Sequence, residues 1–188
     1  MAKNLKKNKE EKRNQEKKHK GRAIITKESD LRAICEGNKV LKPYCKSGLQ
    51  ALKSEYRGKI KVRDKKLFGS SLDLDGALKR EFHNKHRWDY GFEYEGNFIF
   101  IEFHPAQTSE VDKMCKKVLF TKSWIESNCP KILSLPQFET EDRQFYWVAT
   151  GNNDVRLNPL GAQSKKLAQA KIEIVGSIFD YSKLKKMS

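Results

Sequence analysis

The sequence predicts a mixed α/β fold of the α+β kind, in which a central mixed sheet built on a β-hairpin is flanked by helices. Three observations favour this fold class. Residues 87–104 form two strand-like runs around Glu95-Gly96, a two-residue pair suited to a tight hairpin loop. Residues 108–127 carry apolar side chains at helical spacing. Residues 144–150 are apolar and aromatic, as in a central strand.

The elements before the hairpin are predicted from caps and breakers. Residues 27–57 look helical, with a cap at Ser29-Asp30 and breaks at Gly37-Asn38 and Pro43. Residues 60–68 are expected to form a short hairpin around Arg63-Asp64-Lys65-Lys66. Residues 73–82 follow as a helix, with an apolar side that includes Leu74, Leu78 and Phe82.

The elements after the hairpin alternate between helix and strand. The helix over 108–127 is followed by a loop bracketed by Pro130 and Pro136, and then by the strand over 144–150, which Gly151 ends. Residues 159–170 are predicted as a helix and residues 172–175 as a last or edge strand. Tyr146 and Trp147 are therefore expected in the core.

The charge of the chain indicates a polyanionic partner. The 188 residues carry a formal net charge of +15, and residues 1–20 hold nine Lys or Arg against three Glu. Residues 1–22 are low in apolar side chains and are expected to form a disordered basic tail. Residues 23–188 are expected to form a single α/β domain. The first candidate partner is nucleic acid, with DNA favoured over RNA.

Composition and missing motifs exclude several function classes. No stretch approaches the about 20 apolar residues that cross a bilayer, and the N-terminus lacks the apolar core of a secretory signal, so we expect a cytoplasmic protein without a membrane partner. Cys35, Cys45, Cys115 and Cys129 lack metal-site spacing and are interpreted as free thiols. Nucleotide-binding glycine motifs and a nucleophile elbow are also missing from the sequence.

The hairpin brings two acids together. With Glu95-Gly96 as its loop, Asp89 lies directly opposite Glu102, at a Cβ separation of roughly 5 Å. Two carboxylates this close repel each other unless a proton or a cation lies between them. Strand alternation places His104 on the same face, while Tyr90, Phe92 and their neighbours, Trp88 included, are expected on an apolar face. Mg²⁺ or Mn²⁺ prefers such carboxylate oxygens and can activate a bound water.

The order Glu81, Asp89, Glu102-x-His104 resembles the restriction-endonuclease-like superfamily, usually called PD-(D/E)XK. In that family a helix supplies a Glu, one strand an Asp, the next strand a Glu-x-Lys, and a later helix a further Lys or Gln. The resemblance covers about residues 60–150. It implies that Glu81, Asp89 and Glu102 hold the metal, and that Lys116 or Lys117 is the helix residue.

The sequence departs from the family pattern at two positions. Trp88 stands where the family has Pro, and His104 stands where it has Lys. A neutral imidazole can serve as the general base near pH 7, and a helix Lys can take over the same role. A catalytically inactive relative is the remaining option.

Other readings of these residues stay open. Asp89 and Glu102 could pair with Arg87, Lys85 or lysines of the next helix. His83, His86 and His104, together with Asp89, offer a nitrogen-rich metal site. Contacts to the phosphates of nucleic acid are predicted for His86, Arg87, Lys165 and Lys166.

The leading hypothesis is a metal-dependent nuclease that hydrolyses phosphodiester bonds, with Asp89, Glu102, His104 and Lys116 or Lys117 as its catalytic residues. The alternatives are an inactive basic module that binds nucleic acid and an interaction protein of a larger assembly. The oligomeric state is left open, a homodimer included.

Overall fold

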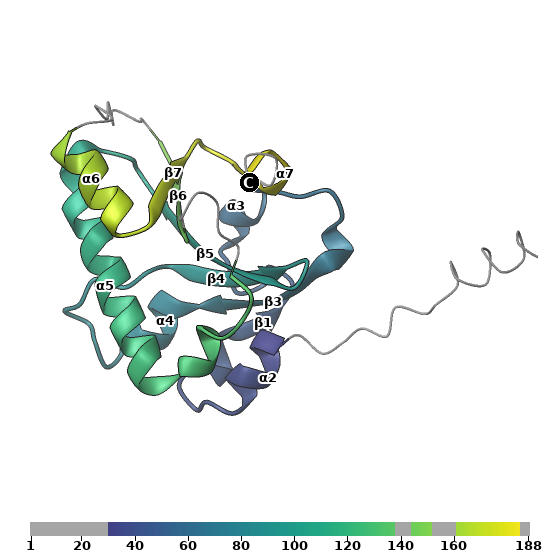
Figure 1. Cartoon of the computed structure of the whole chain (residues 1–188). Coiled ribbons are helices and arrows are strands. Elements are labelled where there is room, and N and C mark those ends of the chain that lie inside the picture. Colours follow the sequence, from purple (N-terminus) through teal and green to yellow (C-terminus); the bar gives the residue numbers. More distant parts are fainter. Residues whose placement is uncertain (1–29, 138–143, 152–160, 185–188) are drawn as a thin grey trace, which may run out of the picture.

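The computed structural model describes residues 30–137, 144–151 and 161–184, and it shows a mixed α+β fold around a central six-stranded mixed sheet (Figure 1). The strand order is β1-β3-β4-β5-β6-β7. The strands are β1 (Cys45–Ser47), β2 (Ile60–Lys61), β3 (Phe68–Asp73), β4 (Tyr90–Tyr94), β5 (Asn97–His104), β6 (Phe145–Ala149), β7 (Ile172–Val175) and β8 (Phe179–Asp180). The α-helices are α2 (Asp30–Glu36), α3 (Ser54–Arg57), α4 (Leu74–Lys79), α5 (Val111–Asn128), α6 (Ala162–Gln169) and α7 (Tyr181–Leu184), and the short 3₁₀ helices are η1 (Lys42–Tyr44), η2 (Lys65–Leu67), η3 (Thr108–Glu110) and η4 (Pro130–Ile132).

The predicted hairpin forms the middle of the sheet. β4 and β5 are antiparallel, with Tyr90 opposite Ile101 and Tyr94 opposite Asn97, which confirms the expected register. Both loop residues have positive φ, 50° at Glu95 and 76° at Gly96, as a type I′ turn requires. Glycine adopts this conformation without strain, whereas Glu95 adopts it because the two-residue loop leaves no alternative.

The second half of the sheet is parallel. β6 pairs with β5 and β7 pairs with β6, both in parallel, and α5 and α6 make the two crossovers. The predictions of α5, β6, α6 and β7 are confirmed within their described residues, although β7 is followed by β8 and α7. Tyr146 and Trp147 are fully buried, as expected of a central strand.

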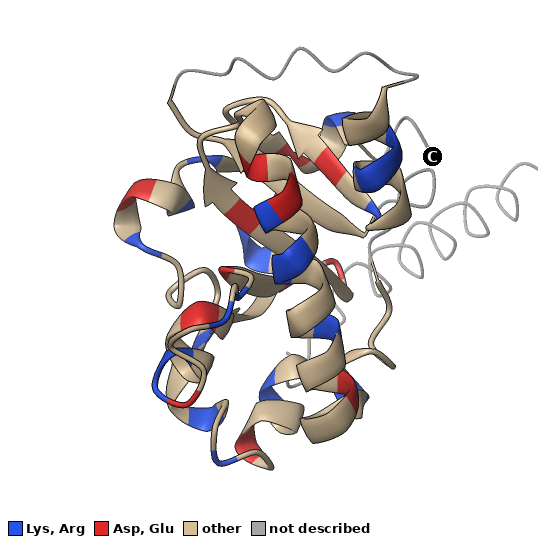
Figure 2. Cartoon of the chain, turned by 90° about the vertical axis from the view of Figure 1, so that its left-hand side faces the viewer, with Lys and Arg blue, Asp and Glu red and all other residues tan. Residues whose placement is uncertain are grey.

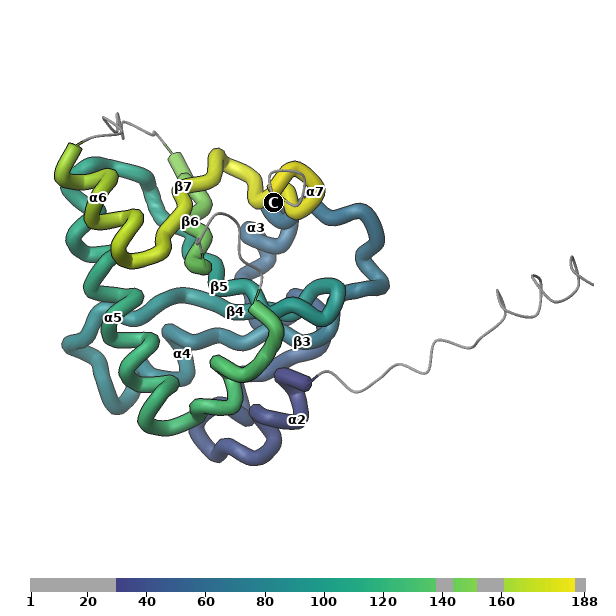
Figure 3. The backbone as a smooth tube through the Cα atoms, viewed as in Figure 1, coloured from purple at the N-terminus to yellow at the C-terminus, as the bar shows by residue number. Residues whose placement is uncertain are grey.

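The sheet is covered on both faces. One apolar cluster joins side chains of α2, α4, α5 and α6 to Phe98, Phe100 and Phe145 of the sheet. The other joins Tyr90, Phe92 and Ile101 to side chains of β8 and α7, with Tyr56 of α3 packed against it. Figure 3 shows α5 and α6 on one side of the strands and α3 and α7 on the other. Trp88 belongs to the α5 side, so its predicted place among the Tyr90 set is wrong, because the chain at Trp88 has not yet entered the strand.

The prediction for residues 27–57 is correct only in part. α2 ends at Glu36, Cys45–Ser47 form an edge strand paired with β3, and α3 spans one turn. The expected hairpin over residues 60–68 is wrong: β2 pairs in parallel with β8, and β3 pairs with β1 and β4. Asp64 caps the 3₁₀ turn between them, accepting a hydrogen bond from Lys66 N at 2.9 Å. Distant partners determine these strands, so local pattern does not reveal them.

The predicted tail at residues 1–22 lies outside the described residues. Across the described ranges, none of the helices combines the length and the apolar character that crossing a bilayer requires.

Candidate active site

Backbone hydrogen bonds hold Asp89 and Glu102 at one end of the hairpin. Asp89 directly precedes β4, and its carbonyl accepts a hydrogen bond from Leu74 N at 2.9 Å. Asp89 N donates to Glu102 Oε2 at 2.9 Å, and Phe103 N donates to Asp89 Oδ2 at 3.2 Å. Each carboxylate thus uses one oxygen to bind the neighbouring strand. The other oxygen of each is left to face the helix layer.

Lys117 of α5 contacts both of the remaining oxygens. Its Nζ donates to Asp89 Oδ1 at 3.2 Å and also to Glu102 Oε1. The side chains of Glu102, Lys117 and Asp89 are 1%, 12% and 20% exposed, so solvent reaches the pair from the Asp89 side. The predicted proximity of two acids is therefore realised, and a lysine from the following helix supplies the cation between them.

Burial of Asp89, Glu102 and Lys117 removes their charges from water and shifts the pKa values of Glu102 and Lys117. Burial raises the pKa of Glu102 well above its usual range, and the negative charge of Asp89 acts in the same direction, while Lys117 opposes both. Burial also disfavours the charged form of Lys117, but the charges of Glu102 and Asp89 outweigh it and raise its pKa. Lys117 is thus held as an ammonium ion. A second cation would lower the cost of ionising Glu102.

His104 belongs to a second polar group, one helical turn away from Lys117. Its Nε2 lies 2.6 Å from Glu110 Oε2, and Lys113 Nζ donates to the same oxygen at 2.8 Å. Hydrogen bonds from Lys113 and His104 lower the pKa of Glu110. The backbone of His104 is fixed as well, because its carbonyl accepts a hydrogen bond from Trp147 Nε1 at 2.9 Å. Nε2 of His104 is therefore engaged with Glu110 at the start of α5.

The two lysines considered for the helix position differ in their surroundings. Lys117 points into the acidic pair, whereas Lys116 is exposed to solvent. Glu81 is also exposed, and it lies in a turn, because α4 ends at Lys79. Its predicted place in the helix is wrong, and among the described residues it makes no interaction with Asp89 or Glu102. Metal ligation by Glu81 stays a prediction.

The residues predicted to contact phosphate have varied roles. Arg87 is engaged within the protein: its Nε donates to Asp75 Oδ1 at 2.9 Å, and its Nη1 donates to the carbonyls of Phe82 and Lys85. Lys166 pairs with Asp112 at 2.7 Å. His86 and Lys165 are exposed.

Three polar residues near the pair escaped the sequence reasoning. Asp73 ends β3, and burial raises its pKa, with Asp75 and Asp89 adding to the effect. Its carboxylate accepts a hydrogen bond from Gly76 N at 2.7 Å, so the sequence signal for it was only that of a helix cap. Glu110 and Lys113 follow His104 at the start of α5, and their i, i+3 spacing was the available signal.

Asp89 and Glu102 can hold a hard cation, because both turn one oxygen toward the position of Lys117 Nζ. Within the described ranges no group of three or more His, Cys, Asp or Glu side chains suited to a metal ion occurs, so His83, His86 and His104 do not form a metal-binding cluster either.

Comparisons of the chain with protein-family models, with curated proteins and with solved structures found no match.

Proposed function

We propose that the protein is a metal-dependent nuclease of the restriction-endonuclease-like kind. The observation that carries the proposal is the group formed by Asp89, Glu102 and Lys117. An acid before one strand, an acid on the next strand and a lysine from the following helix occur in the order that the family resemblance implies. The sheet agrees with this order, since α5 links the hairpin to a parallel strand.

Each residue has a role that follows from its surroundings. Asp89 and Glu102 would hold Mg²⁺ or Mn²⁺, which supplies a water of lowered pKa and neutralises charge on the phosphate. Lys117 is the ammonium ion nearest to the two acids, so it can orient the attacking water or stabilise the phosphorane-like transition state. It takes the role that the family gives to the strand Lys. His104, held by Glu110, is the candidate for proton transfer at the edge of the group.

The decisive experiment measures hydrolysis of plasmid DNA and of single-stranded RNA with Mg²⁺, with Mn²⁺ and with EDTA. Asp89→Asn, Glu102→Gln and Lys117→Met should each lower the rate by about a hundredfold or more, because each removes a few kcal/mol of transition-state stabilisation. Lys116→Met is the matched control, since it removes an equal charge from the exposed neighbour, and it should stay within about threefold of the wild type. Wild-type-like rates in Asp89→Asn or Glu102→Gln would contradict the proposal.

A second candidate function is an inactive nucleic-acid-binding module. It is favoured by one observation: Lys117 already supplies the cation that the two acids require. A lysine in this position can stabilise the pair as a buried ion triad, without a metal and without hydrolysis.

Unfolding of Lys117→Met separates the two functions. Removal of the ammonium leaves two adjacent carboxylates, one of them fully buried, and should cost about 3–5 kcal/mol of unfolding free energy. Under the nuclease proposal, millimolar Mn²⁺ raises the unfolding free energy of the wild type and of Lys116→Met, because their two acids bind the ion, and it also restores part of the loss in Lys117→Met. An inactive module shows the same loss of stability without restoration by Mn²⁺.

A further inference from the structure

Residues 57–66, which we call the basic loop, carry an unusual density of positive charge. The loop contains six basic residues and a single acid, Asp64. The basic residues are Arg57, Lys59, Lys61, Arg63, Lys65 and Lys66. Among the described residues, Lys61 pairs with Asp180 at 3.3 Å, whereas Lys59, Arg63, Lys65 and Lys66 have no carboxylate partner. Like charges held this close repel one another, so the loop is a natural place for a polyanion.

The backbone of the basic loop is fixed on the fold. Lys59 O accepts a hydrogen bond from Phe179 N at 2.9 Å, and Asp64 N donates to the hydroxyl of Tyr94 at 3.3 Å. Arg57 donates from Nε to Leu52 O at 2.9 Å and from Nη2 to Gln50 O at 3.1 Å, so its guanidinium is held in place, and no acid within the described ranges forms an ion pair with it. These cations are therefore presented on a defined surface, which lowers the entropy lost on binding.

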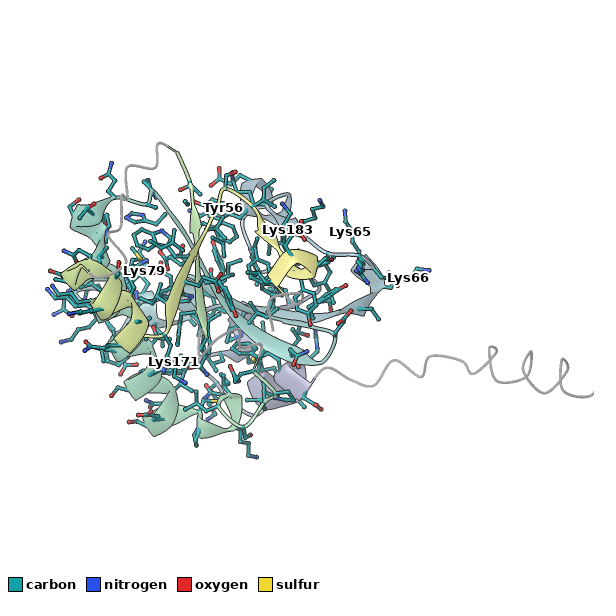
Figure 4. The ribbon with its side chains drawn as sticks, turned by 45° about the horizontal axis from the view of Figure 1, so that its top comes forward. Tyr56, Lys65, Lys66, Lys79, Lys171 and Lys183 are labelled. Atoms are coloured by element: carbon teal, nitrogen blue, oxygen red, sulfur yellow. The ribbon has the colours of Figure 1, made fainter. Side chains whose placement is uncertain are left out.

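The basic loop extends away from the rest of the molecule. Figure 3 shows it passing beside α7 and projecting on the side away from α5 and α6. Lys65 and Lys66 point outward from its far end, and Lys183 of α7 lies on the same side, whereas Lys79 lies on the opposite side (Figure 4).

One end of the basic loop lies next to the candidate active site. Tyr56 directly precedes Arg57, and its ring stacks on Phe103 with centroids 4.4 Å apart. Phe103 follows Glu102 in β5, and its N–H donates to Asp89. Burial raises the pKa of Tyr56, and the negative charges of Glu55, Asp89 and Glu102 add to the effect, as their proximity requires. Tyr56 packs on the face of the sheet opposite to Lys117, so a strand of phosphates that follows the loop would reach the acidic pair around the end of the sheet at which Asp89 precedes β4.

The helix layer offers a less suitable surface. Acidic and basic side chains are interspersed along α5, and α6 carries its lysines next to them (Figure 2). Lys166 is paired with Asp112, and Lys113 with Glu110. These two pairs compensate part of the charge on this face, whereas the basic loop has a single such pair, that of Lys61 with Asp180.

We propose that the basic loop is the surface that binds the sugar-phosphate backbone of nucleic acid and delivers it to Asp89 and Glu102. The proposal rests on the proposed function in that it takes nucleic acid as the ligand, and it assigns binding to residues 57–66 in place of His86, Arg87, Lys165 and Lys166.

The test measures binding of the full-length protein to fluorescent duplex DNA and single-stranded RNA by anisotropy, in EDTA and over a range of salt concentrations. One variant changes Lys59, Arg63, Lys65 and Lys66 to Gln. The matched control changes four exposed lysines outside the loop, Lys39, Lys46, Lys79 and Lys131, to Gln, so both proteins lose the same charge and keep residues 1–22. The loop variant should bind at least about tenfold more weakly, with a salt slope reduced by up to about 3.6 if each of the four cations contacts one phosphate. The control should bind within about threefold of the wild type.

The outcomes separate this proposal from the nuclease proposal. Because EDTA prevents hydrolysis, weaker binding by the loop variant supports the basic loop even if the protein never cleaves its ligand. Equal affinities of the loop variant and the control would overturn the proposal, even for an active nuclease, and so would a wild type that binds neither DNA nor RNA.

Discussion

Glu102 is the residue on which the chemistry of the candidate site depends most. Its carboxylate is fully buried, accepts a hydrogen bond from Asp89 N and contacts Lys117. Burial of a carboxylate disfavours its ionised form, and one ammonium ion offsets only part of that cost. The folded protein therefore keeps this buried carboxylate at the expense of its own stability.

The stability of the protein should fall with pH because of Glu102. The pKa of Glu102 is raised in the folded state, so the folded protein binds its proton more tightly than the unfolded chain does. Unfolding then releases a proton between the ordinary pKa, near 4.5, and the raised value, and the free energy of unfolding decreases as pH rises through that window, by up to about 1.4 kcal/mol per pH unit. Urea unfolding of Glu102→Gln from pH 4 to pH 8 should lack this decrease.

Glu126→Gln provides the control, because Glu126 is an exposed acid on α5, the helix that carries Lys117. Its unfolding profile should follow that of the wild type. A Glu102→Gln protein whose stability changes with pH as in the wild type would show that Glu102 carries no such penalty.

At the scale of elements, the packing of the hairpin depends on the absence of a Cβ atom at Gly91. A Cβ on Gly91 would lie 2.2 Å from Phe98 Cζ, far inside van der Waals contact. The ring of Phe98 cannot retreat, because it is fully buried and packs edge-on against Phe100 with centroids 4.8 Å apart. Gly91 therefore permits the aromatic packing beneath α5.

Gly91→Ala should lower the free energy of unfolding by about 1–3 kcal/mol, since the added methyl group overpacks the core. Gly58→Ala is the control: its φ is −70° and a Cβ there meets nothing within 4 Å, so the change should be neutral or slightly stabilising. Chemical denaturation of both variants measures the difference, and equal stabilities would refute the packing argument.

The sequence predicted best those helices and strands whose formation depends on residues close together in the chain. The register of β4 and β5 follows from a two-residue loop and strand alternation, and α5 follows from its apolar stripe. β1 and β2 have only three and two residues and owe their existence to partners elsewhere in the chain, which no local pattern reveals. At the site, the pairing of Asp89 with Glu102 follows from counting residues outward from the two-residue loop of the hairpin. The choice of Lys117 over Lys116 required the rotation of α5 about its axis, which the hairpin alone does not determine.

At the scale of the whole molecule, the last described strand, β8, completes the apolar layer on the face of the sheet opposite to α5. Phe179 of β8 is fully buried, with its ring 5.2 Å from that of Tyr146 and 6.1 Å from that of Phe92. Its strand pairs with β2, at the centre of the basic loop. The C-terminal segment thus supports both the core and the proposed binding surface.

Phe179→Ala should destabilise the protein by about 3–5 kcal/mol, because it opens a cavity next to the rings of Phe92 and Tyr146. Ile178→Ala changes the neighbouring residue, which is 49% exposed, and should alter stability by less than about 0.5 kcal/mol. Thermal unfolding of both variants provides the comparison. Similar melting temperatures would show that this segment contributes little to the core.

The pairing of β2 with β8 also has a kinetic consequence. Residues 60 and 179 are far apart in the chain, so this contact has a high closure entropy, whereas the hairpin that joins Asp89 to Glu102 closes locally. We expect the acids to meet early in folding and the basic loop to be fixed late. In the native state the same two-residue pairing should be among the first to open, so amide hydrogens near Ile60 should exchange faster than those of β5. The β2–β8 sheet, which is separate from the six-stranded sheet, would then open while the central strands stay paired.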